Sequence, residues 1–319
     1  MARFLMRRIL LGVIVMWAVA TLVFIMYYVA PHDPARLIAG RGATAATLAD
    51  VKRRLGLNQP IIDQYGHYMW RLLQGNLGYS YFNSEPVTTI IGRELPVTAS
   101  LAFGGAVIWL VLGVFSGVLA STHPRSIADR AVTSLALFFY SMPTFLLGLL
   151  LLLLLFYRLH VAGFDFFPGG GYVGPTTSVY QWFTHMILPW ITLALVTAAT
   201  YSRLTRGSML DVLGEDYIRT ARAKGLSERR VVYRHGLRSA LTPVVTQFGI
   251  DVGQLLGGVI VTETVFGLPG LGQQIVNSIS RQDLPVIIGL VLVAAAFVVT
   301  ANILVDAVYA VLDPRVRLT

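Results

Sequence analysis

Six runs of apolar residues divide this chain of 319 residues, and each is long enough to cross a lipid bilayer as a helix. A hydrocarbon core about 30 Å thick needs roughly 20 apolar helical residues. Backbone groups inside a bilayer must be satisfied within the segment, so such spans are helices. The runs cover about residues 9–30, 97–121, 132–157, 186–204, 240–262 and 285–312. The sequence therefore predicts an all-α membrane protein with six transmembrane helices.

The composition supports this class. Hydrophobic residues make up 55% of the chain and charged residues 13%, against roughly 45–50% and about 25% in soluble domains. In such a protein we interpret the net charge of +9 as the basic excess of the cytoplasmic side and not as a sign of nucleic-acid binding. The chain has no cysteine, which excludes disulfides and thiolate catalysis. Its six histidines form no ligand spacing, so no metal site is predicted.

The distribution of Lys and Arg predicts the orientation. Segment 205–239 holds eight of these residues, whereas the short segments 158–185 and 263–284 hold one each. Basic residues concentrate in cytoplasmic loops, so both termini are expected in the cytoplasm. The basic N-terminus and the first run resemble a signal peptide. The run exceeds the usual length of roughly 7–15 residues and no A-x-A site lies directly after its end, so we expect a retained first helix.

Residues 31–96, between the first two runs, are expected to form the only sizeable polar segment, on the extracytoplasmic side of the membrane. Apolar residues at helical spacing predict one helix near 48–55, which Gly56 could end, and a second near 60–73. This small helical segment is either a structural lid or a docking platform for another protein. The expected divisions are 1–30, 31–96 and a five-helix core at 97–319.

A charged, helix-compatible stretch at 215–243 separates the fourth and fifth runs. A connection between two helices needs only roughly 2–8 residues. A longer loop with helical character favours a docking surface for another protein, although a basic loop facing anionic lipid is the alternative. Glu215 and Asp216 suit a helix N-terminus, Gly225 suits a turn with positive φ, and Ala221 is small enough to allow close approach of a partner.

Polar side chains interrupt the fifth and sixth runs at helical spacing, and each set shares one helix face. Ionisable residues inside a span indicate function, so these sets are expected to line a hydrophilic path. Hydrogen bonding between helices is the alternative. The candidates are Gln247, Asp251 and Gln254 in the fifth run, and Asn302 and Asp306 in the sixth.

Two outer loops carry further signals. Residues 269–272, PGLG, predict a tight turn before a short amphipathic helix at 273–280. We expect Glu263, Phe266 and Pro269 to form an outer gate. The triglycine at 169–171 predicts a flexible loop.

Three stretches in the expected order resemble the inner-membrane permeases of dipeptide and oligopeptide ABC importers, and the resemblance extends from the first helix to the last. They are RTARAKGLSERRVVYRHGLRSALTPVV at 219–245, ETVFGLPGLGQQIVNSISRQDLPVIIGLVLV at 263–293 and NILVDAVYAVLDPRVR at 302–317. The first is similar to that subfamily's form of the loop that couples a permease to its ATPase. Arg219 and Thr220 depart from the general pattern of this loop, while Ala221 and Gly225 match it.

The resemblance implies a permease of the type I ABC importer kind in the inner membrane. The implied partners are a homologous second permease, two ATPase subunits, an extracytoplasmic binding protein and membrane lipid. ATP and Mg would bind the ATPase subunits, and this chain would hold no cofactor. Peptides are the implied cargo, with nickel complexes or another small solute as the alternative. The implied coupling residues are Glu215, Asp216, Arg219, Ala221, Arg222 and Gly225.

The sequence lacks the motifs expected of an ATPase, a secondary transporter or an intramembrane enzyme. A P-loop needs Gly-Lys followed by Ser or Thr, and the two lysines follow Val51 and Ala223. A secondary transporter working alone would leave the charged loop unexplained and would need internal repeats that are not evident. An intramembrane enzyme would need a nucleophile or H-E-x-x-H setting that the spans do not contain, so no catalytic residue is predicted.

Overall fold

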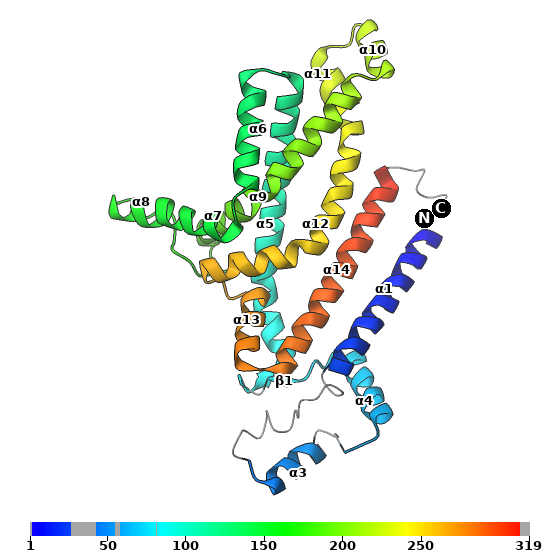
Figure 1. Ribbon diagram of the computed structural model, residues 1–319, viewed down its shortest axis with the longest axis vertical. Helices are drawn as coiled ribbons and strands as arrows, with labels where there is room; N and C mark the ends of the chain where they lie inside the picture. Colours follow the sequence, from blue (N-terminus) through cyan, green and yellow to red (C-terminus); the bar gives the residue numbers. More distant parts are fainter. Residues whose placement is uncertain (1, 27–42, 55–57, 81, 313–319) are drawn as a thin grey trace. The chain divides into compact units, whose positions relative to one another are not determined.

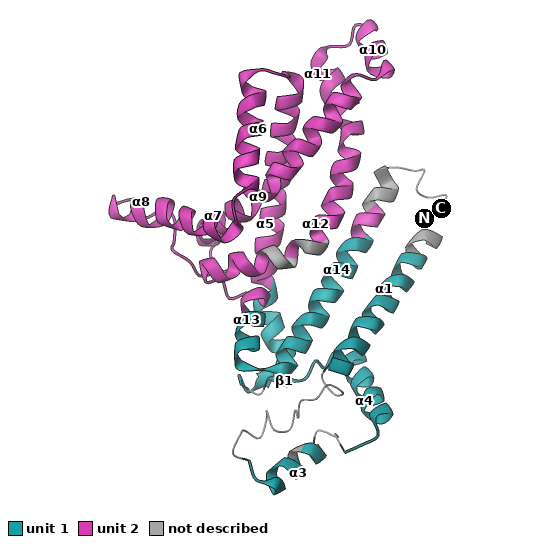
Figure 2. Ribbon diagram, in the orientation of Figure 1, with its two compact units in different colours: residues 1–95, 274–303 teal, residues 96–273, 304–319 magenta. Residues whose placement is uncertain are grey.

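The computed structural model describes residues 2–26, 43–54, 58–80 and 82–312, with the side chains of some residues left aside, Gln254 among them. The described chain is mainly helical (Figure 1) and forms two compact units (Figure 2). Unit 1 comprises residues 1–95 and 274–303, and unit 2 comprises 96–273 and 304–319. The predicted divisions followed position in the membrane, whereas these units follow compactness. Gly56 lies outside the described residues.

Unit 1 contains the two helices that the sequence predicts within residues 31–96. Its elements begin with α1 (Ala2–Phe24), α3 (Ala45–Arg54), α4 (Ile61–Leu73) and the hairpin of β1 (Tyr79–Ser80) and β2 (Glu85–Pro86). The two strands are antiparallel, with Tyr79 opposite Pro86. The first part of α5 (Val87–Thr122) and most of α14 (Leu284–Leu312) complete the unit.

The amphipathic face of α4 packs against the end of α1. The Phe24 ring lies 5.2 Å from the Tyr65 ring and 5.5 Å from the Tyr68 ring, measured between centroids. The Thr21 and Tyr65 hydroxyl oxygens are 2.8 Å apart and share a hydrogen bond. The helical period of the apolar residues in 60–73 thus buries one face of α4 against the first membrane helix.

Unit 2 holds the remaining helices. In chain order they are α6 (Ile127–Tyr140), α7 (Thr144–Leu151), the π-helical η2 (Leu152–Tyr157), α8 (Arg158–Val161), α9 (Val179–Leu213), α10 (Asp216–Ala223), α11 (Glu228–Arg230), the π-helical η3 (Val231–Gly236), α12 (Leu237–Phe266) and the start of α13 (Leu271–Arg281). Helices α11, η3 and α12 follow one another without interruption from Glu228 to Phe266.

The core of unit 2 lies between α5, α9 and α12, with Trp109, Tyr201 and Val259 among its buried residues. Glycines on α5 permit a close approach of α9. A Cβ atom at Gly113 would lie 2.4 Å from the Tyr201 Cβ, and one at Gly117 would lie 2.6 Å from the Ser202 carbonyl oxygen. Small residues at a helix interface let membrane helices pack closely, and these two glycines perform that role here.

Within the described residues, five helices are long and apolar enough to cross a membrane. They lie in five of the six predicted runs, and the run at 240–262 corresponds to α12. The prediction of one continuous helix at 132–157 is wrong, because α6 ends at Tyr140 and α7 begins at Thr144. Pro143 disfavours helical backbone at the residue before it, which explains the break.

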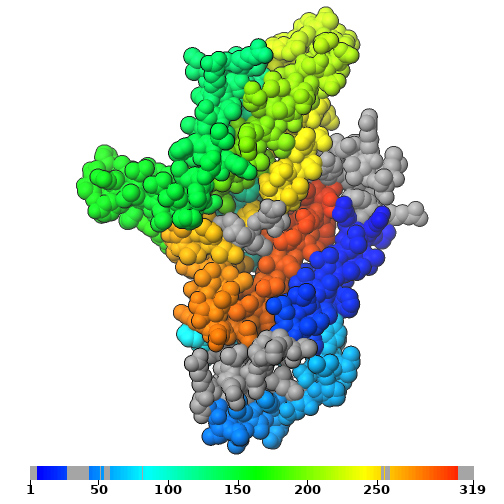
Figure 3. All heavy atoms as spheres, viewed as in Figure 1, coloured from blue at the N-terminus to red at the C-terminus, as the bar shows by residue number. Residues whose placement is uncertain are grey.

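The segment Thr144–Val161 stands out from unit 2 as an arm (Figure 3). Only 11% of the residues in its most apolar window are buried, against 56% in α9. Its leucine-rich surface is therefore open to the surrounding bilayer or to another membrane helix.

Candidate functional site

The charged loop folds into a short helix at one end of unit 2 (Figure 1). Glu215 occupies the position before α10, and Asp216 lies in its first turn, where the helix dipole favours negative charge. Gly225 follows the helix with φ +73°, as the sequence predicts. No atom lies within 4 Å of a Cβ built at Gly225, so the backbone conformation requires glycine there and space does not.

One face of α10 is buried against its own chain. Ile218 is fully buried, Ala221 is 8% exposed, and both pack against Val231 of η3. The Tyr217 hydroxyl donates a 3.1 Å hydrogen bond to the Ser239 hydroxyl. Ala221, which was predicted to admit a partner, therefore points inward, and its small size lets α10 lie close to η3.

The two arginines of α10 differ in their surroundings. The Arg222 guanidinium donates to both carboxylate oxygens of Glu228, at 3.1 and 2.7 Å, and these bonds lower the pKa of Glu228. The Arg219 side chain is 73% exposed and lies 3.4 Å from the Asp216 carboxylate. Arg219 therefore faces outward, whereas Arg222 holds α10 to the segment that follows it.

A second ion pair, between α6 and α9, was not recognised in the sequence. Arg206 donates to both oxygens of Asp129, at 2.6 and 2.9 Å, and the backbone N–H of Arg125 donates a third bond. These bonds lower the pKa of Asp129 to about 2. A planar guanidinium matches a carboxylate with two parallel bonds, so the pair joins α6 to α9 with a defined geometry at this point. The two residues are 77 positions apart, and no local pattern reveals them.

The polar residues predicted to line a path have different surroundings in the structure. The Gln247 amide donates a 2.8 Å hydrogen bond to the Asp251 carboxylate one turn later, and both residues are half-buried. Asn302 is exposed, and Asp306 is half-buried with interactions of its own. The side chain of Gln254 lies outside the described residues. Sequence reasoning did not identify Tyr201, whose hydroxyl faces Asp251 from α9.

The three residues predicted to form an outer gate do not share one surface. Glu263 and Phe266 are buried, at 0% and 2% exposure, whereas Pro269 is exposed. The Thr98 hydroxyl donates a 2.6 Å bond to one Glu263 oxygen, and the Gln273 backbone N–H donates a 2.9 Å bond to the other. Glu263 thus caps the N-terminus of α13 and ties it to α5 and α12.

Glycines in the 269–272 turn and in the 169–171 loop leave room for the contacts between the end of α12 and the start of α13. A Cβ at Gly270 would lie 2.2 Å from a Glu263 carboxylate oxygen, and one at Gly272 would lie 2.7 Å from the Ile260 Cα. The Gly171 backbone N–H donates a 3.2 Å bond to the Phe266 carbonyl oxygen, where a Cβ at Gly170 would lie 2.5 Å away. The predicted flexible triglycine loop is therefore docked on the end of α12.

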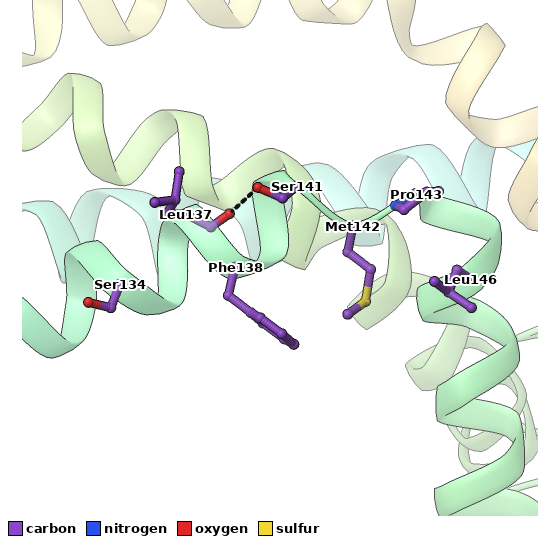
Figure 4. Close-up of a pocket in the computed structure, with 7 residues that line it drawn as sticks. All are labelled: Ser134, Leu137, Phe138, Ser141, Met142, Pro143 and Leu146. Carbon is purple, nitrogen blue, oxygen red and sulfur yellow. Dashed lines mark hydrogen bonds between the residues drawn. The ribbon is translucent and has the colours of Figure 1, made fainter.

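A groove of about 510 Å³ lies at the corner between α6 and α7 (Figure 4). Phe138, Met142 and Leu146 line it, and the Ser141 hydroxyl on its edge donates a 2.9 Å bond to the Leu137 carbonyl oxygen. The lining is mainly apolar and this hydroxyl already has a partner. The groove therefore resembles a lipid-facing surface more than a binding site for a polar solute.

Comparison with known proteins identifies the same class of permease that the sequence resembles. Residues 1–102 match the N-terminal part, and residues 109–318 the main part, of the binding-protein-dependent transport system inner membrane component. The dipeptide transport system permease protein DppB of Escherichia coli K12 is 38% identical over 336 residues, with 99% of each chain covered. A Sinorhizobium fredii protein named "Probable peptide ABC transporter permease protein y4tP" is 37% identical over 317 residues, covering 99% of this chain and 100% of the relative.

A solved structure shows the same fold. The MetNI methionine ABC transporter, in an inward-facing conformation, superposes with a TM-score of 0.55 at 21% identity, over 72% of this chain and 99% of that one. The fold is therefore that of a type I ABC importer permease, and the chain is a multi-pass transport subunit of the inner membrane and not an enzyme. It belongs to the binding-protein-dependent transport system inner membrane components and, within them, to the peptide-type ABC permeases.

Proposed function

We propose that this chain forms half of the translocation path of an ATP-driven peptide importer. A homologous second permease completes the path, two ATPase subunits bind the cytoplasmic loops, and an extracytoplasmic binding protein delivers the peptide. ATP and Mg bind the ATPase subunits. Both termini lie in the cytoplasm, in agreement with the basic residues of segment 205–239.

The main support for this proposal is that α10 is buried on one face and exposed on the other. The helix is attached to unit 2 through Ile218, Ala221 and the bond from Tyr217 to Ser239, and its opposite face with Arg219 and Thr220 is exposed. A short helix held rigidly on one face and open on the other can enter a groove on a partner protein. Its motion would pass directly into η3 and α12, because the chain is helical from Glu228 to Phe266.

The mechanism is alternating access. Closure of the ATPase dimer on ATP moves α10 and opens the outer side of the path to peptide, and hydrolysis resets it. Gln247, Asp251, Asn302 and Asp306 are the described candidates for the lining of the path, together with Gln254. The same machinery could import nickel complexes or another small solute, since cargo is selected in large part by the binding protein.

Site-specific crosslinking tests the docking surface directly. The chain has no cysteine, so Thr220→Cys on the exposed face of α10 introduces its only thiol. A photoactivatable reagent on this thiol should crosslink the ATPase subunit, and the yield should change with ATP. Thr242→Cys, exposed on α12, is the matched control and should give no such product. An intact complex in which position 220 never crosslinks the ATPase would refute the docking role.

ATP-dependent uptake of a labelled dipeptide by cells producing all the subunits tests the cargo. Uptake that requires the ATPase and the binding protein supports peptide import. Uptake of a nickel complex in place of peptide would select the alternative cargo.

A further inference from the structure

Trp109 of α5, Tyr201 of α9 and Phe248 of α12 form an aromatic cluster in unit 2, next to Asp251 of α12. Tyr201 on α9 and Trp109 on α5 are 0% and 1% exposed, and their ring centroids are 6.3 Å apart. The Tyr201 hydroxyl is near enough to interact with both the Trp109 indole and the Asp251 carboxylate. Phe248, one helical turn before Asp251 on α12, has its ring centroid 6.3 Å from that of Trp109.

Two of these buried groups have unused hydrogen-bonding capacity. Among the residues that the structure describes, neither the Trp109 indole nitrogen nor the Tyr201 hydroxyl has a partner within hydrogen-bond geometry. Buried polar groups are nearly always satisfied, because a buried donor without a partner has lost its hydrogen bond to water and gained none in return. Two buried donors with free hydrogen-bonding capacity, one of them facing the Asp251 carboxylate, therefore point to a polar ligand at this place.

We propose that Asp251, Tyr201 and Trp109 form a binding site for the amino-terminal end of a peptide. The Asp251 carboxylate holds the α-ammonium group, and the Tyr201 hydroxyl and the Trp109 N–H donate to the first peptide carbonyl. This inference rests on the proposed peptide transport. It assigns to this chain the recognition of one end of the cargo.

The chemistry of the cluster selects this ligand over others. A metal ion needs several oxygen ligands, whereas two of the three groups here present hydrogen-bond donors. An organic cation with an adjacent acceptor satisfies both the carboxylate and the donors, and the α-ammonium and first carbonyl of a peptide are adjacent. The aromatic rings of Trp109, Tyr201 and Phe248 add a surface that attracts organic cations.

The burial of the groups is consistent with an approach from the side of Asp251. Asp251 and Phe248 are half-buried, whereas the two donors behind them are covered. The Gln247 amide holds one oxygen of Asp251 at 2.8 Å and so orients the carboxylate before the ligand arrives. Such preorganisation reduces the entropy cost of binding.

Equilibrium dialysis of the complete transporter in nanodiscs tests the site without the binding protein. Labelled dialanine and its N-acetyl derivative are the two probes, each measured with and without a non-hydrolysable ATP analogue. The unmodified peptide should bind at least about tenfold more tightly than the acetylated one, since a tenfold ratio corresponds to about 1.4 kcal/mol. Asp251→Asn should abolish this preference, and Tyr201→Phe should weaken the binding of both probes.

Two controls separate the site from general damage. Asp251→Glu retains the charge and should recover part of the preference. Asp211→Asn makes the same chemical change at an exposed position of α9 and should behave as the wild type.

The outcomes distinguish this inference from the proposed function. Normal dipeptide uptake with no saturable binding to the nanodisc complex, or with a preference that survives Asp251→Asn, would overturn the inference and leave peptide import standing. Either result would mean that Tyr201 and Trp109 do not bind the amino-terminal end of the peptide. Absence of dipeptide uptake in the wild type would instead overturn the proposed function.

Discussion

The hydroxyl of Thr98 lies 2.6 Å from the carboxylate of Glu263, and one hydrogen bond joins residues that are 165 positions apart. The same hydroxyl oxygen accepts a 2.8 Å bond from the Leu271 backbone N–H. Thr98 and Glu263 therefore provide, from two other helices, the acceptors that the first turn of α13 cannot find within itself. The buried carboxylate maintains the attachment of the 269–272 turn to the end of α12.

A methyl group at Gly272 should loosen this junction. Gly272→Ala would place its Cβ 2.7 Å from the Ile260 Cα and 2.9 Å from the Glu263 carboxylate. Backbone must then shift, and overpacking of this kind costs about 1–3 kcal/mol. We expect a lower thermal midpoint of the purified chain and reduced dipeptide uptake.

Gly207→Ala is the matched control for this change. Gly207 also lies within a helix, α9, but no atom is within 4 Å of its Cβ position. Alanine should stabilise that helix by about 0.5–1 kcal/mol. Equal thermal midpoints for the two variants would contradict the close contact at Gly272.

A larger side chain at Ala221 should uncouple transport from ATP hydrolysis. Ala221→Leu forces a bulky group between α10 and Val231, where Ala221 is only 8% exposed. The overpacking should cost about 1–3 kcal/mol and displace α10 from η3. Peptide uptake should fall severalfold while the amount of chain in the membrane stays unchanged.

Ala223→Leu adds the same atoms to the exposed side of α10 and so separates packing from docking. It should leave the thermal midpoint of the purified chain unchanged. If Ala221→Leu transported peptide at the wild-type rate, α10 could not be acting as a rigid element.

Because of the ion pair between Asp129 and Arg206, the thermal stability of the protein should depend on pH in the acidic range. Hydrogen bonds from Arg206, with one from the Arg125 backbone, lower the pKa of Asp129 from 3.8 to about 2. A carboxyl with a lowered pKa in the folded state contributes its full stabilisation above the unfolded value, and the contribution is lost as the pH falls through the folded value.

Thermal midpoints of the purified wild type and of Asp129→Asn, measured as a function of pH, test this expectation. The wild type should be more stable by a constant amount above pH 3.8, and the difference should shrink as the pH approaches 2. Asp211→Asn, at an exposed position, should show no such convergence. A difference between wild type and Asp129→Asn that persists at the lowest pH would show that packing and not charge connects α6 to α9.

The sequence predicted most helices because length and hydropathy are local properties. The helices within residues 31–96, the turn at Gly225 and the helix after the PGLG turn all follow from residues close together in the chain. The break before Pro143 was missed although its signal is present, since apolar residues continue on both sides of it. The prediction relied on the length of the apolar run and neglected the effect of proline on the backbone of the residue before it.

The candidate site was less predictable, because its contacts are distant in the sequence. Glu263 was identified as notable, but its role depends on Thr98 and on the two glycines that leave it room. Ala221 was expected to allow the close approach of a partner, because the sequence of α10 alone does not reveal which of its faces Val231 covers. Trp109 and Tyr201 lie in apolar runs, where an aromatic residue usually indicates core packing, so only their unmet donors reveal them.

The π-helical turn η3 accommodates one more residue between α10 and α12 than an α-helical turn would. A π turn closes its hydrogen bonds over five residues where an α turn uses four, so it absorbs one extra residue while the helix on either side stays continuous. Loss of an exposed residue such as Arg234 from η3 could convert the turn to α geometry and leave both flanks in phase. The same deletion within α12 would rotate everything beyond it by about 100° and turn Asp251 to another face. The loss of a single residue is therefore better tolerated at residues 231–236 than within α12.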